Sequence, residues 1–472
     1  MDYTTTVLIT LVIYKIILIG IGFYANQKTS TTEDYFIGGR GLGPWVAAIS
    51  SAASASSAWT LLGMSGAAYA MGLSAIWIVP AVILGYAFNW IWLAPKLQKK
   101  AAQEKSVTLS ELLANGSGSF TRPVLWLCSI CIVLAFTFYI AAQFQAAGTT
   151  FANTFDISMA SSIIMGTTII LIYTLLGGFW AVSITDTLQG FLMALAALVL
   201  PIAGLMAVGG PTELWQQMHS AFSATQMQLT GESTGFVAIA FVFGLLAIGL
   251  GNPGQPHVVN RMMALKDEKS VQQAKFIAIG WSAIVITGML IVGWCAKVLL
   301  EPLANNEQAL LDVTNLLFPP VVAGIIIAAI LSAIMSTADS QLLVSAAAIS
   351  YDIRDNKSNR NSLLYSRLTV VIMCIISMLI ALYAPDDIFS RVLFAWNALG
   401  AAFGPLLIVK VISSSVNGKH AFAAIFVGFF LSVILSLLPS PPGDYLERII
   451  PFVLAFAIAW HGRTSNNEYQ SA

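Results

Sequence analysis

The sequence predicts an all-α protein that crosses a lipid bilayer many times. Hydrophobic residues make up 57% of its 472 residues and charged residues only 9%, whereas soluble domains carry about 25% charge. The mean hydropathy is +0.81. Apolar runs long enough to span a bilayer, which takes roughly 20 residues, recur along nearly the whole chain. A net charge of zero argues against a nucleic-acid partner.

Hydropathy predicts about thirteen spans, and no cleavable signal precedes them. The four cysteines lie within or at the edges of these spans, which is typical of apolar packing and not of a disulfide framework. The spans lie near Thr5–Ala25, Leu42–Tyr69, Ser74–Ala94, Pro123–Ala147, Met159–Leu176, Leu188–Val208, Gly235–Leu250, Phe276–Val298, Pro319–Ser350, Leu364–Ala384, Ile388–Val411, Ala421–Leu438 and Ile449–Trp460.

The distribution of lysine and arginine predicts the orientation. Loops that follow odd-numbered spans hold most of these residues, including the basic loop Arg261–Lys275, whereas the other side holds only Lys297, Arg391 and Arg448. Cytoplasmic loops carry the excess of positive charge. We therefore expect the N-terminus outside and the C-terminus inside a cytoplasmic membrane. Lys15 lies near the centre of the first span, where a structural role is expected.

The ninth span carries unusually many polar groups around Ser332–Gln341. On a helix, Ala333, Ser336, Thr337 and Ser340 share one face, and Asp339 lies at its rim. Hydrocarbon provides no water for these groups, so each needs a protein partner, an ion or an aqueous cavity. A helix face of hydroxyls beside a carboxylate resembles half of a cation site.

The second span is rich in small hydroxylic residues between Ala47 and Gly66. Two interpretations stay open: close packing of helices through small residues, or a helix unwound at mid-membrane that offers carbonyls to a cation. Asp186 opens the sixth span, where it is either an N-cap or a functional carboxylate. The seventh span breaks at Gly249–His257, which holds two prolines and three glycines; we favour an interrupted helix, with His257 solvated or capping.

The irregular second and seventh spans are five spans apart. Spans two to six and seven to eleven would then form two five-helix halves of opposite topology, an inverted repeat. The expected organisation is a single transmembrane domain over residues 1–472. Its parts are a peripheral first helix and loop (1–40), the first repeat (41–210), the second repeat (234–412), and two C-terminal helices with a short tail (413–472).

Six motifs in order give the chain a resemblance to the sodium/solute symporter family, closest to its sodium/proline symporters. The resemblance implies a LeuT-type fold and sodium-driven import by alternating access, with no enzymatic activity. The motifs are Phe36–Gly43, the second span ending at Trp59–Gly63, Gly177–Gln189, Gly254–His257, Met335–Thr337 with Ser340–Val344, and Gly400–Pro405.

The resemblance also implies the residues of the sites. The shared sodium site matches the carbonyls of Ala53, Ser56 and Ala333 and the hydroxyls of Ser336 and Thr337, the kind of oxygen ligands that hard cations prefer. A possible second sodium site matches Asp186, Ser336, Asp339 and Ser340. The expected substrate positions are Ser54, Ser57, Tyr139, Gln143, Ile248, Asn252, Gln255 and Pro256; the residues alone leave Tyr139, Gln143 and Gln145 either lining a cavity or lying at the membrane interface.

This chain departs from the proline symporters at several positions. They have an aspartate where it has Ala55, aromatic residues where it has Ile248 and Asn252, and a serine where it has Asp339. Proline is therefore in doubt as the substrate. One hypothesis is that Asp339 supplies the negative charge that Ala55 lacks, as a ligand of a further sodium ion or as a protonatable group.

The expected function is sodium-coupled import of a small polar organic solute, an amino acid such as proline or another carboxylate, with no obligatory protein partner. The alternative within the same fold is coupling to protons through Asp339 or Asp186. An intramembrane enzyme is disfavoured because the four histidines lie at or outside span ends and no hydrolase or metalloprotease motif occurs. A sensor or channel is disfavoured because only a short tail follows the last span.

Overall fold

The structure is a computed structural model. It describes residues 3–26, 36–176, 178–353, 361–384, 387–413, 415–439 and 441–464. Gly177 of the third motif lies outside these ranges, and so do four of the basic residues in loops that follow odd-numbered spans, namely Lys28, Arg354, Lys357 and Arg360.

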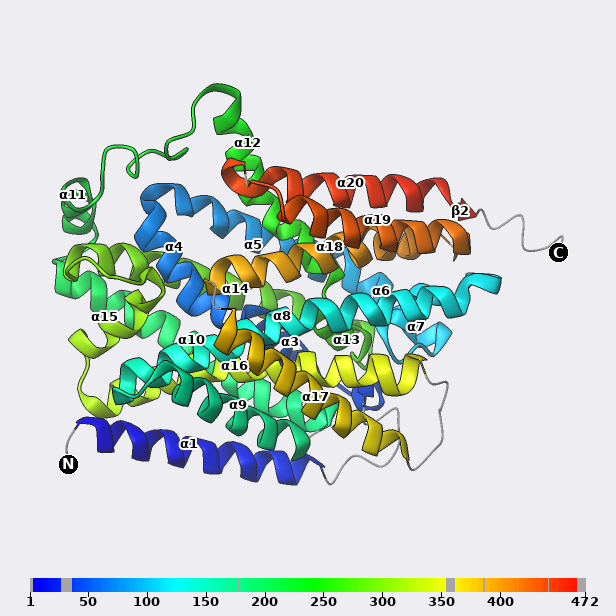
Figure 1. The fold of residues 1–472 in the computed structure, drawn as a ribbon, viewed down its shortest axis with the longest axis horizontal. Coiled ribbons are helices and arrows are strands. Elements are labelled where there is room, and N and C mark those ends of the chain that lie inside the picture. Colours follow the sequence, from blue (N-terminus) through cyan, green and yellow to red (C-terminus); the bar gives the residue numbers. More distant parts are fainter. Residues whose placement is uncertain are drawn as a thin grey trace.

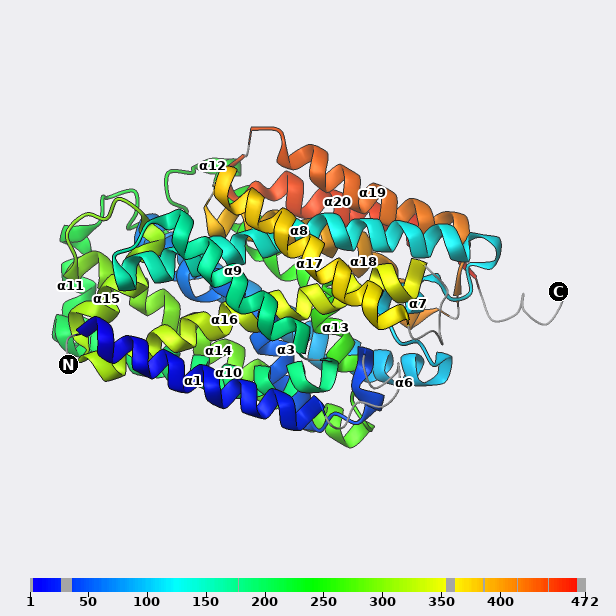
Figure 2. The same cartoon turned by 60° about the horizontal axis from the view of Figure 1, so that its bottom comes forward.

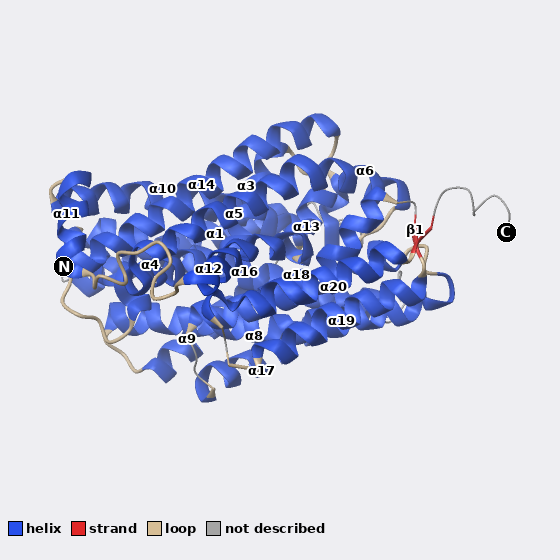
Figure 3. Cartoon of the chain, turned by 90° about the horizontal axis from the view of Figure 1, so that it is seen from above, coloured by secondary structure: helices blue, strands red, loops and turns tan. Residues whose placement is uncertain are grey.

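Nearly every described element is a helix (Figure 3). The first ten α-helices are α1 (Tyr3–Asn26), α3 (Pro44–Ala58), α4 (Met64–Met71), α5 (Ile78–Ala87), α6 (Ala94–Glu104), α7 (Leu109–Ala114), α8 (Thr121–Phe155), α9 (Met159–Leu176), α10 (Phe179–Val208) and α11 (Pro211–Ala221). The remaining ones are α12 (Gly235–Leu246), α13 (Pro256–Met263), α14 (Glu268–Leu299), α15 (Ala309–Leu317), α16 (Pro320–Ala347), α17 (Asn361–Tyr383), α18 (Ile388–Ile412), α19 (Gly418–Ser436) and α20 (Tyr445–His461).

Short 3-10 or π-helical turns join several of these helices, and one small sheet lies near the C-terminus. The turns are η1 (Gly38–Arg40), η2 (Trp59–Gly63), η3 (Gly72–Trp77), η4 (Phe88–Leu93), η5 (Gly118–Phe120), η6 (Ala247–Gly254), η7 (Asn306–Gln308), η8 (Ala348–Ile353) and η9 (Pro442–Asp444). Strands β1 (Ser415–Val416) and β2 (Arg463–Thr464) pair antiparallel.

Within the described residues, ten helical segments are long and apolar enough to cross a membrane. One of them, Pro44–Glu104, contains both the second and the third predicted spans, so the expectation of a multi-pass protein holds. The figure of about thirteen spans, the paired halves and the division of the chain into parts stay predictions.

The long helices run along one common direction, with the start of α1 and strand β2 at opposite ends (Figure 1). Helix α16 lies inside the bundle, and 83% of its most apolar stretch is buried, against 17% for α1 at the edge. Helix α1 packs along α16 and α10 (Figure 2). The polar residues of α16 are therefore shielded from lipid by neighbouring helices.

Of the two interpretations of the second span, the interrupted helix is found, and the break expected in the seventh span occurs as well. In α3 the backbone of Ser57 departs from helical geometry, with φ +53° and ψ −175°, and the π-helical turn η2 follows. The seventh predicted span changes from α12 to the 3-10 turn η6, passes through an extended Gln255, and restarts as α13 at Pro256. Proline lacks the N–H that a continuous helix would use, which explains why this break lies at its prolines.

Two glycines on α14 provide a test of the packing. A Cβ at Gly288 would lie 2.2 Å from the Ala197 carbonyl oxygen on α10, whereas a Cβ at Gly280 would meet nothing within 4 Å. We expect Gly288→Ala to destabilise the protein by about 1–3 kcal/mol, because the helices must separate. The matched control Gly280→Ala should be neutral or slightly stabilising, because alanine favours helices. Thermal unfolding in detergent compares the two; equal midpoints would contradict this packing.

Candidate functional site

The break in α3 faces the hydroxyl-bearing side of α16. The Ser336 hydroxyl donates to the carbonyl oxygens of Ala53 at 3.2 Å and of Ala333 at 3.3 Å. The Thr337 hydroxyl donates to the Ser54 carbonyl oxygen at 2.9 Å. All five residues are fully buried. Main-chain and hydroxyl oxygens from two helices distant in sequence therefore meet in one place.

This donor set has the chemistry of a site for a hard monovalent cation. Such ions take carbonyl and hydroxyl oxygens as ligands, and a hydroxyl that donates to a carbonyl can turn its lone pairs towards an ion instead. Of the expected ligands, Ala53, Ala333, Ser336 and Thr337 lie together. The Ser56 carbonyl accepts the Trp59 N–H, and the Ser56 hydroxyl donates to the Ala52 carbonyl at 2.8 Å, so Ser56 has other partners here.

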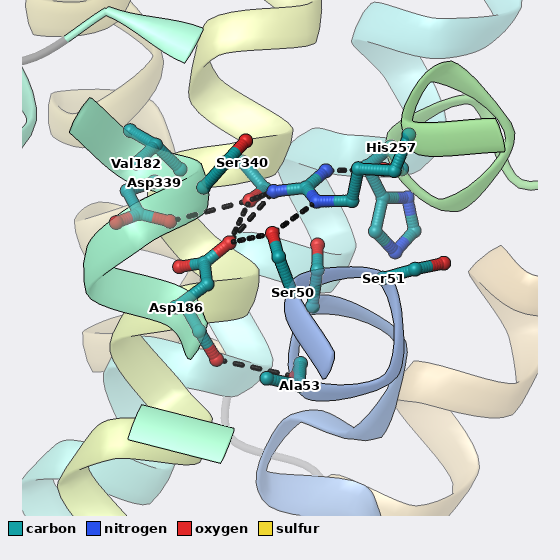
Figure 4. A network of polar contacts seen from close by, with 12 residues as sticks. Ser50, Ser51, Ala53, Val182, Asp186, His257, Asp339 and Ser340 are labelled. Atoms are coloured by element: carbon teal, nitrogen blue, oxygen red, sulfur yellow. Dashed lines mark hydrogen bonds and ion pairs between the residues drawn. The ribbon is translucent and has the colours of Figure 1, made fainter. Parts of the chain in front are cut away.

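A second polar cluster lies beside the first (Figure 4). Arg261 of α13 pairs with Asp186 of α10, with 2.7 Å between Nη2 and Oδ2. Arg261 also donates through Nη2 to the Ser340 hydroxyl at 2.6 Å and through Nε to the Ser50 hydroxyl at 2.7 Å. The Asp186 carboxylate accepts from Ser50 at 3.1 Å and from Ser340 at 3.4 Å. One guanidinium therefore joins four elements: α3, α10, α13 and α16.

Three positions differ from the expectations. Arg261 belongs to a buried helix and is 1% exposed, so placing it in a basic loop was wrong. Asp186 lies well inside α10, which begins at Phe179, so it is not an N-cap. His257 is fully buried and contacts the rings of Phe136 and Tyr139 edge-on, so it is neither solvated nor a cap.

Asp339 lies next to this cluster. Its Oδ1 accepts from the Ser340 hydroxyl at 3.4 Å. Its Oδ2 is buried and has no hydrogen-bond partner within the described ranges. Of the residues expected at a second sodium site, Asp186, Asp339 and Ser340 are thus grouped, with the Arg261 guanidinium among them, whereas Ser336 points to Ala53.

A small cavity lies next to the α3 break. Its space is about 30 Å³, room for a water molecule. Tyr139, Ile248 and Asn252 of the expected substrate residues line it. Asn252 is held by Asn89, whose amide donates to it at 3.0 Å. The remaining lining comes from Ala55, Ser56, Trp59, Thr60, Val82, Tyr86, Gly249, Trp281, Ser282, Val285, Ile286, Val392, Leu393 and Trp396.

The other expected substrate residues do not line this cavity. The Ser57 hydroxyl accepts from Tyr139 at 3.3 Å, and the Gln143 carbonyl oxygen accepts the Ala58 N–H at 3.0 Å. Gln255 donates to the carbonyls of Gly251 and Trp396 and so ties the seventh-span break to α18. Pro256 starts α13 and is buried. The Ser54 hydroxyl is buried without a hydrogen-bond partner among the described residues.

Several aromatic residues of the cavity were not predicted from the sequence. Trp281 and Trp396 lie in apolar spans, and hydropathy does not distinguish a residue that lines a cavity from one that faces lipid. Trp59 stacks on Phe389 with ring centroids 5.5 Å apart. Both rings lie between this cavity and a wider one, which Gln145, Glu307 and Asp387 help to line. The stacked rings close the small cavity on that side.

Comparison with known proteins places this geometry in a family. The model of the sodium:solute symporter family matches residues 35–428. The osmoregulated proline transporter OpuE of Bacillus subtilis is 32% identical over 89% of this chain and 87% of its own length. The sodium/proline symporter of Salmonella typhimurium is 32% identical over 91% of this chain and 87% of its own length.

Solved structures share the fold. A Na⁺-coupled sialic acid symporter in a substrate-bound outward-open state aligns with a TM-score of 0.80, covering 98% of both chains at 19% identity. The nucleobase-cation-symport-1 family transporter Mhp1, in a closed conformation, aligns with a TM-score of 0.59, covering 90% of this chain and 93% of its own at 12% identity.

Proposed function

Because the chain belongs to the sodium:solute symporter family, we propose that it imports a small polar organic solute together with sodium by alternating access. The family and the curated relatives are transporters and not enzymes. The observation that carries the proposal is the contact between α3 and α16, where the hydroxyls of Ser336 and Thr337 meet the carbonyls of Ala53 and Ser54. The family match does not favour the alternative of proton coupling.

Sodium binds between α3 and α16 in this proposal. Ala53, Ser56 and Ala333 provide carbonyl oxygens, and Ser336 and Thr337 provide hydroxyls. A bound ion replaces the direct contacts between hydroxyls and carbonyls and fixes the distance between the two helices. By linkage, sodium then raises the affinity for the solute by the same factor by which the solute raises the affinity for sodium.

We place one sodium ion per chain at this contact. The second site expected around Asp186, Asp339 and Ser340 contains the Arg261 guanidinium, which already binds the Asp186 carboxylate and the Ser340 hydroxyl. A sodium ion there would have to displace a buried and fully paired arginine, which is costly. Arg261 supplies the positive charge that a second ion would otherwise bring.

The solute binds between the two breaks, where the small cavity must widen to hold it when the surrounding helices separate. The residues that line this cavity are aromatic, aliphatic or neutral polar, and none of them carries a formal charge. A solute without net charge, such as a zwitterionic amino acid, matches this lining because its own charges cancel, whereas a net charge would be buried unpaired. Proline is one candidate, although Ile248 and Asn252 replace the aromatic residues of the proline symporters.

The cycle opens this cavity to one side at a time. On one side the stacked Trp59 and Phe389 must part to admit a solute. On the other, the buried pair of Arg261 and Asp186 joins α13 to α10 and must separate before the helices can. We place the N-terminus and the wider cavity with Glu307 outside the cell, and the C-terminus in the cytoplasm, as the excess of basic loop residues indicates.

A thermal-shift screen in detergent tests this function. Purified protein is heated with single solutes (zwitterionic amino acids, carboxylates and neutral polyols) in sodium buffer and in choline buffer. We expect a zwitterionic solute to raise the unfolding midpoint only with sodium, because a ligand that binds the native state stabilises it. Equal stabilisation by a solute in choline, or stabilisation by carboxylates alone, would contradict the proposal.

A further inference from the structure

Lys15 of helix α1 contacts Met335 on α16, the helix that carries the hydroxyls of the proposed sodium site. We propose that Lys15 on α1 is the charge partner of Asp339 on α16 and a positioning residue for that site. The effect of this pair on sodium binding rests on the proposed function, whereas the ion pair itself does not. Lys15 lies near the middle of a helix that otherwise presents Ile13, Ile16 and Ile17 to the outside, so its charge needs a partner within the protein.

The contacts direct Lys15 towards α16. Its Nζ contacts the Sδ of Met335, and the neighbouring Tyr14 hydroxyl contacts the Ser332 hydroxyl. Ser332, Met335 and Asp339 follow one another at spacings of three and four residues, so they share one face of α16. The Lys15 ammonium therefore lies against Met335, one helical turn before Asp339 on the same face of α16.

Both groups lack a full set of hydrogen-bond partners. A thioether is a weak acceptor for an ammonium with three donors. Oδ2 of Asp339 is buried and without a hydrogen-bond partner in the part of the chain that the structure describes. The four-carbon stem of lysine is flexible, so rotation of the side chain along the face of α16 brings the ammonium to this oxygen.

The charge balance of the region points to the same pair. Asp186 and Asp339 place two carboxylates inside the bundle, and Arg261 pairs with Asp186. Without a further cation, Asp339 would be either an unpaired buried charge, at a considerable cost, or a protonated acid. Lys15 supplies that cation from α1, so the two carboxylates have two internal partners.

The pair sets the electrostatic field at the sodium site. Asp339 lies two residues after Thr337 and next to Ser340 on the same helix. While Lys15 neutralises Asp339, the ion at the contact between α3 and α16 is attracted only by dipoles. When Lys15 is removed, the unpaired carboxylate attracts cations to this part of α16. Lys15 thereby positions Asp339 without touching sodium or solute.

A double-mutant cycle on the purified protein tests the ion pair. We expect Lys15→Met and Asp339→Asn each to lower the unfolding midpoint in detergent, and the double variant to lose less than the sum of the two, because neither partner is then left unpaired. Lys15→Arg should keep the midpoint. Lys419→Met, at an exposed lysine on α19, is the control for loss of a cation. Additive single effects would overturn the pair.

Sodium titration tests the positioning role. Sodium-dependent stabilisation of the purified protein should reach half-saturation at a roughly tenfold lower sodium concentration in Lys15→Met, because one unpaired buried carboxylate near a cation site has an effect of about that size. Lys15→Arg and the double variant should stay near the wild type. Unchanged half-saturation in Lys15→Met overturns the positioning role. If sodium does not stabilise the wild-type protein, the proposed function is refuted. The double-mutant cycle then still tests whether Lys15 and Asp339 form an ion pair.

Discussion

Replacement of Thr337 by alanine is expected to raise the sodium concentration that half-saturates uptake by about 10- to 100-fold, the range seen when a metal site loses one supporting group. The Thr337 hydroxyl is directed at the Ser54 carbonyl across the contact between α3 and α16, and alanine removes a ligand oxygen without opening a large cavity. Uptake of the solute found by the thermal-shift screen, measured against sodium concentration in proteoliposomes, gives this value.

Two controls separate ligand loss from damage to the helix. Thr337→Ser keeps the hydroxyl and should keep sodium half-saturation near the wild-type value. Ser345→Ala removes a buried hydroxyl from the same helix, but that hydroxyl donates to the carbonyl of Gln341 in its own helix at 2.8 Å, so sodium dependence should not change. Equal effects of Thr337→Ala and Ser345→Ala would show that the hydroxyl of Thr337 has no special role.

Replacement of Arg261 by methionine is expected to cost about 3–5 kcal/mol of stability, the usual effect of leaving one member of a buried ion pair alone. Arg261 and Asp186 are both almost fully buried, and the arginine also donates to Ser50 and Ser340. Asp186→Asn should be costly for the same reason, because it leaves a buried guanidinium. Expression level and the unfolding midpoint in detergent measure the loss.

The charge-neutral double variant Asp186→Asn with Arg261→Met should recover part of this stability, since no unpaired charge remains. Lys266→Met, at an exposed lysine in the loop that follows α13, should leave the midpoint unchanged. A double variant as unstable as the sum of the single ones would contradict a direct pair. A stable Arg261→Met would contradict the role of the guanidinium as an internal cation.

The sequence was informative about the contact between α3 and α16 because both halves of it have a local signal. Hydroxyls at helical spacing in an apolar span predict the face of α16 that bears Ser336 and Thr337. Six serines within a short stretch of the second span indicate either close helix packing or an unwound helix, and the structure has the interruption. The structure brings these two segments together, although they are 283 residues apart between Ser54 and Thr337.

The second cluster could not be predicted in the same way. Arg261 follows a break rich in proline and glycine, and a charged residue after such a break is usually in a loop. Its partner Asp186 is 75 residues away along the chain, and no spacing rule links the two. The contact of Lys15 with α16 depends on which side of α1 packs against the bundle. Because α1 is apolar on nearly all sides, its hydrophobic pattern does not identify that side.

The central claim is that a single sodium ion joins α3 and α16 through carbonyl and hydroxyl oxygens. Equilibrium binding of ²²Na⁺ to the purified protein in detergent tests it most directly. The account predicts one ion per chain for the wild type and for Ser345→Ala, and loss of that ion from the variant that carries both Ser336→Ala and Thr337→Ala. Undiminished ²²Na⁺ binding by this double variant would contradict the account.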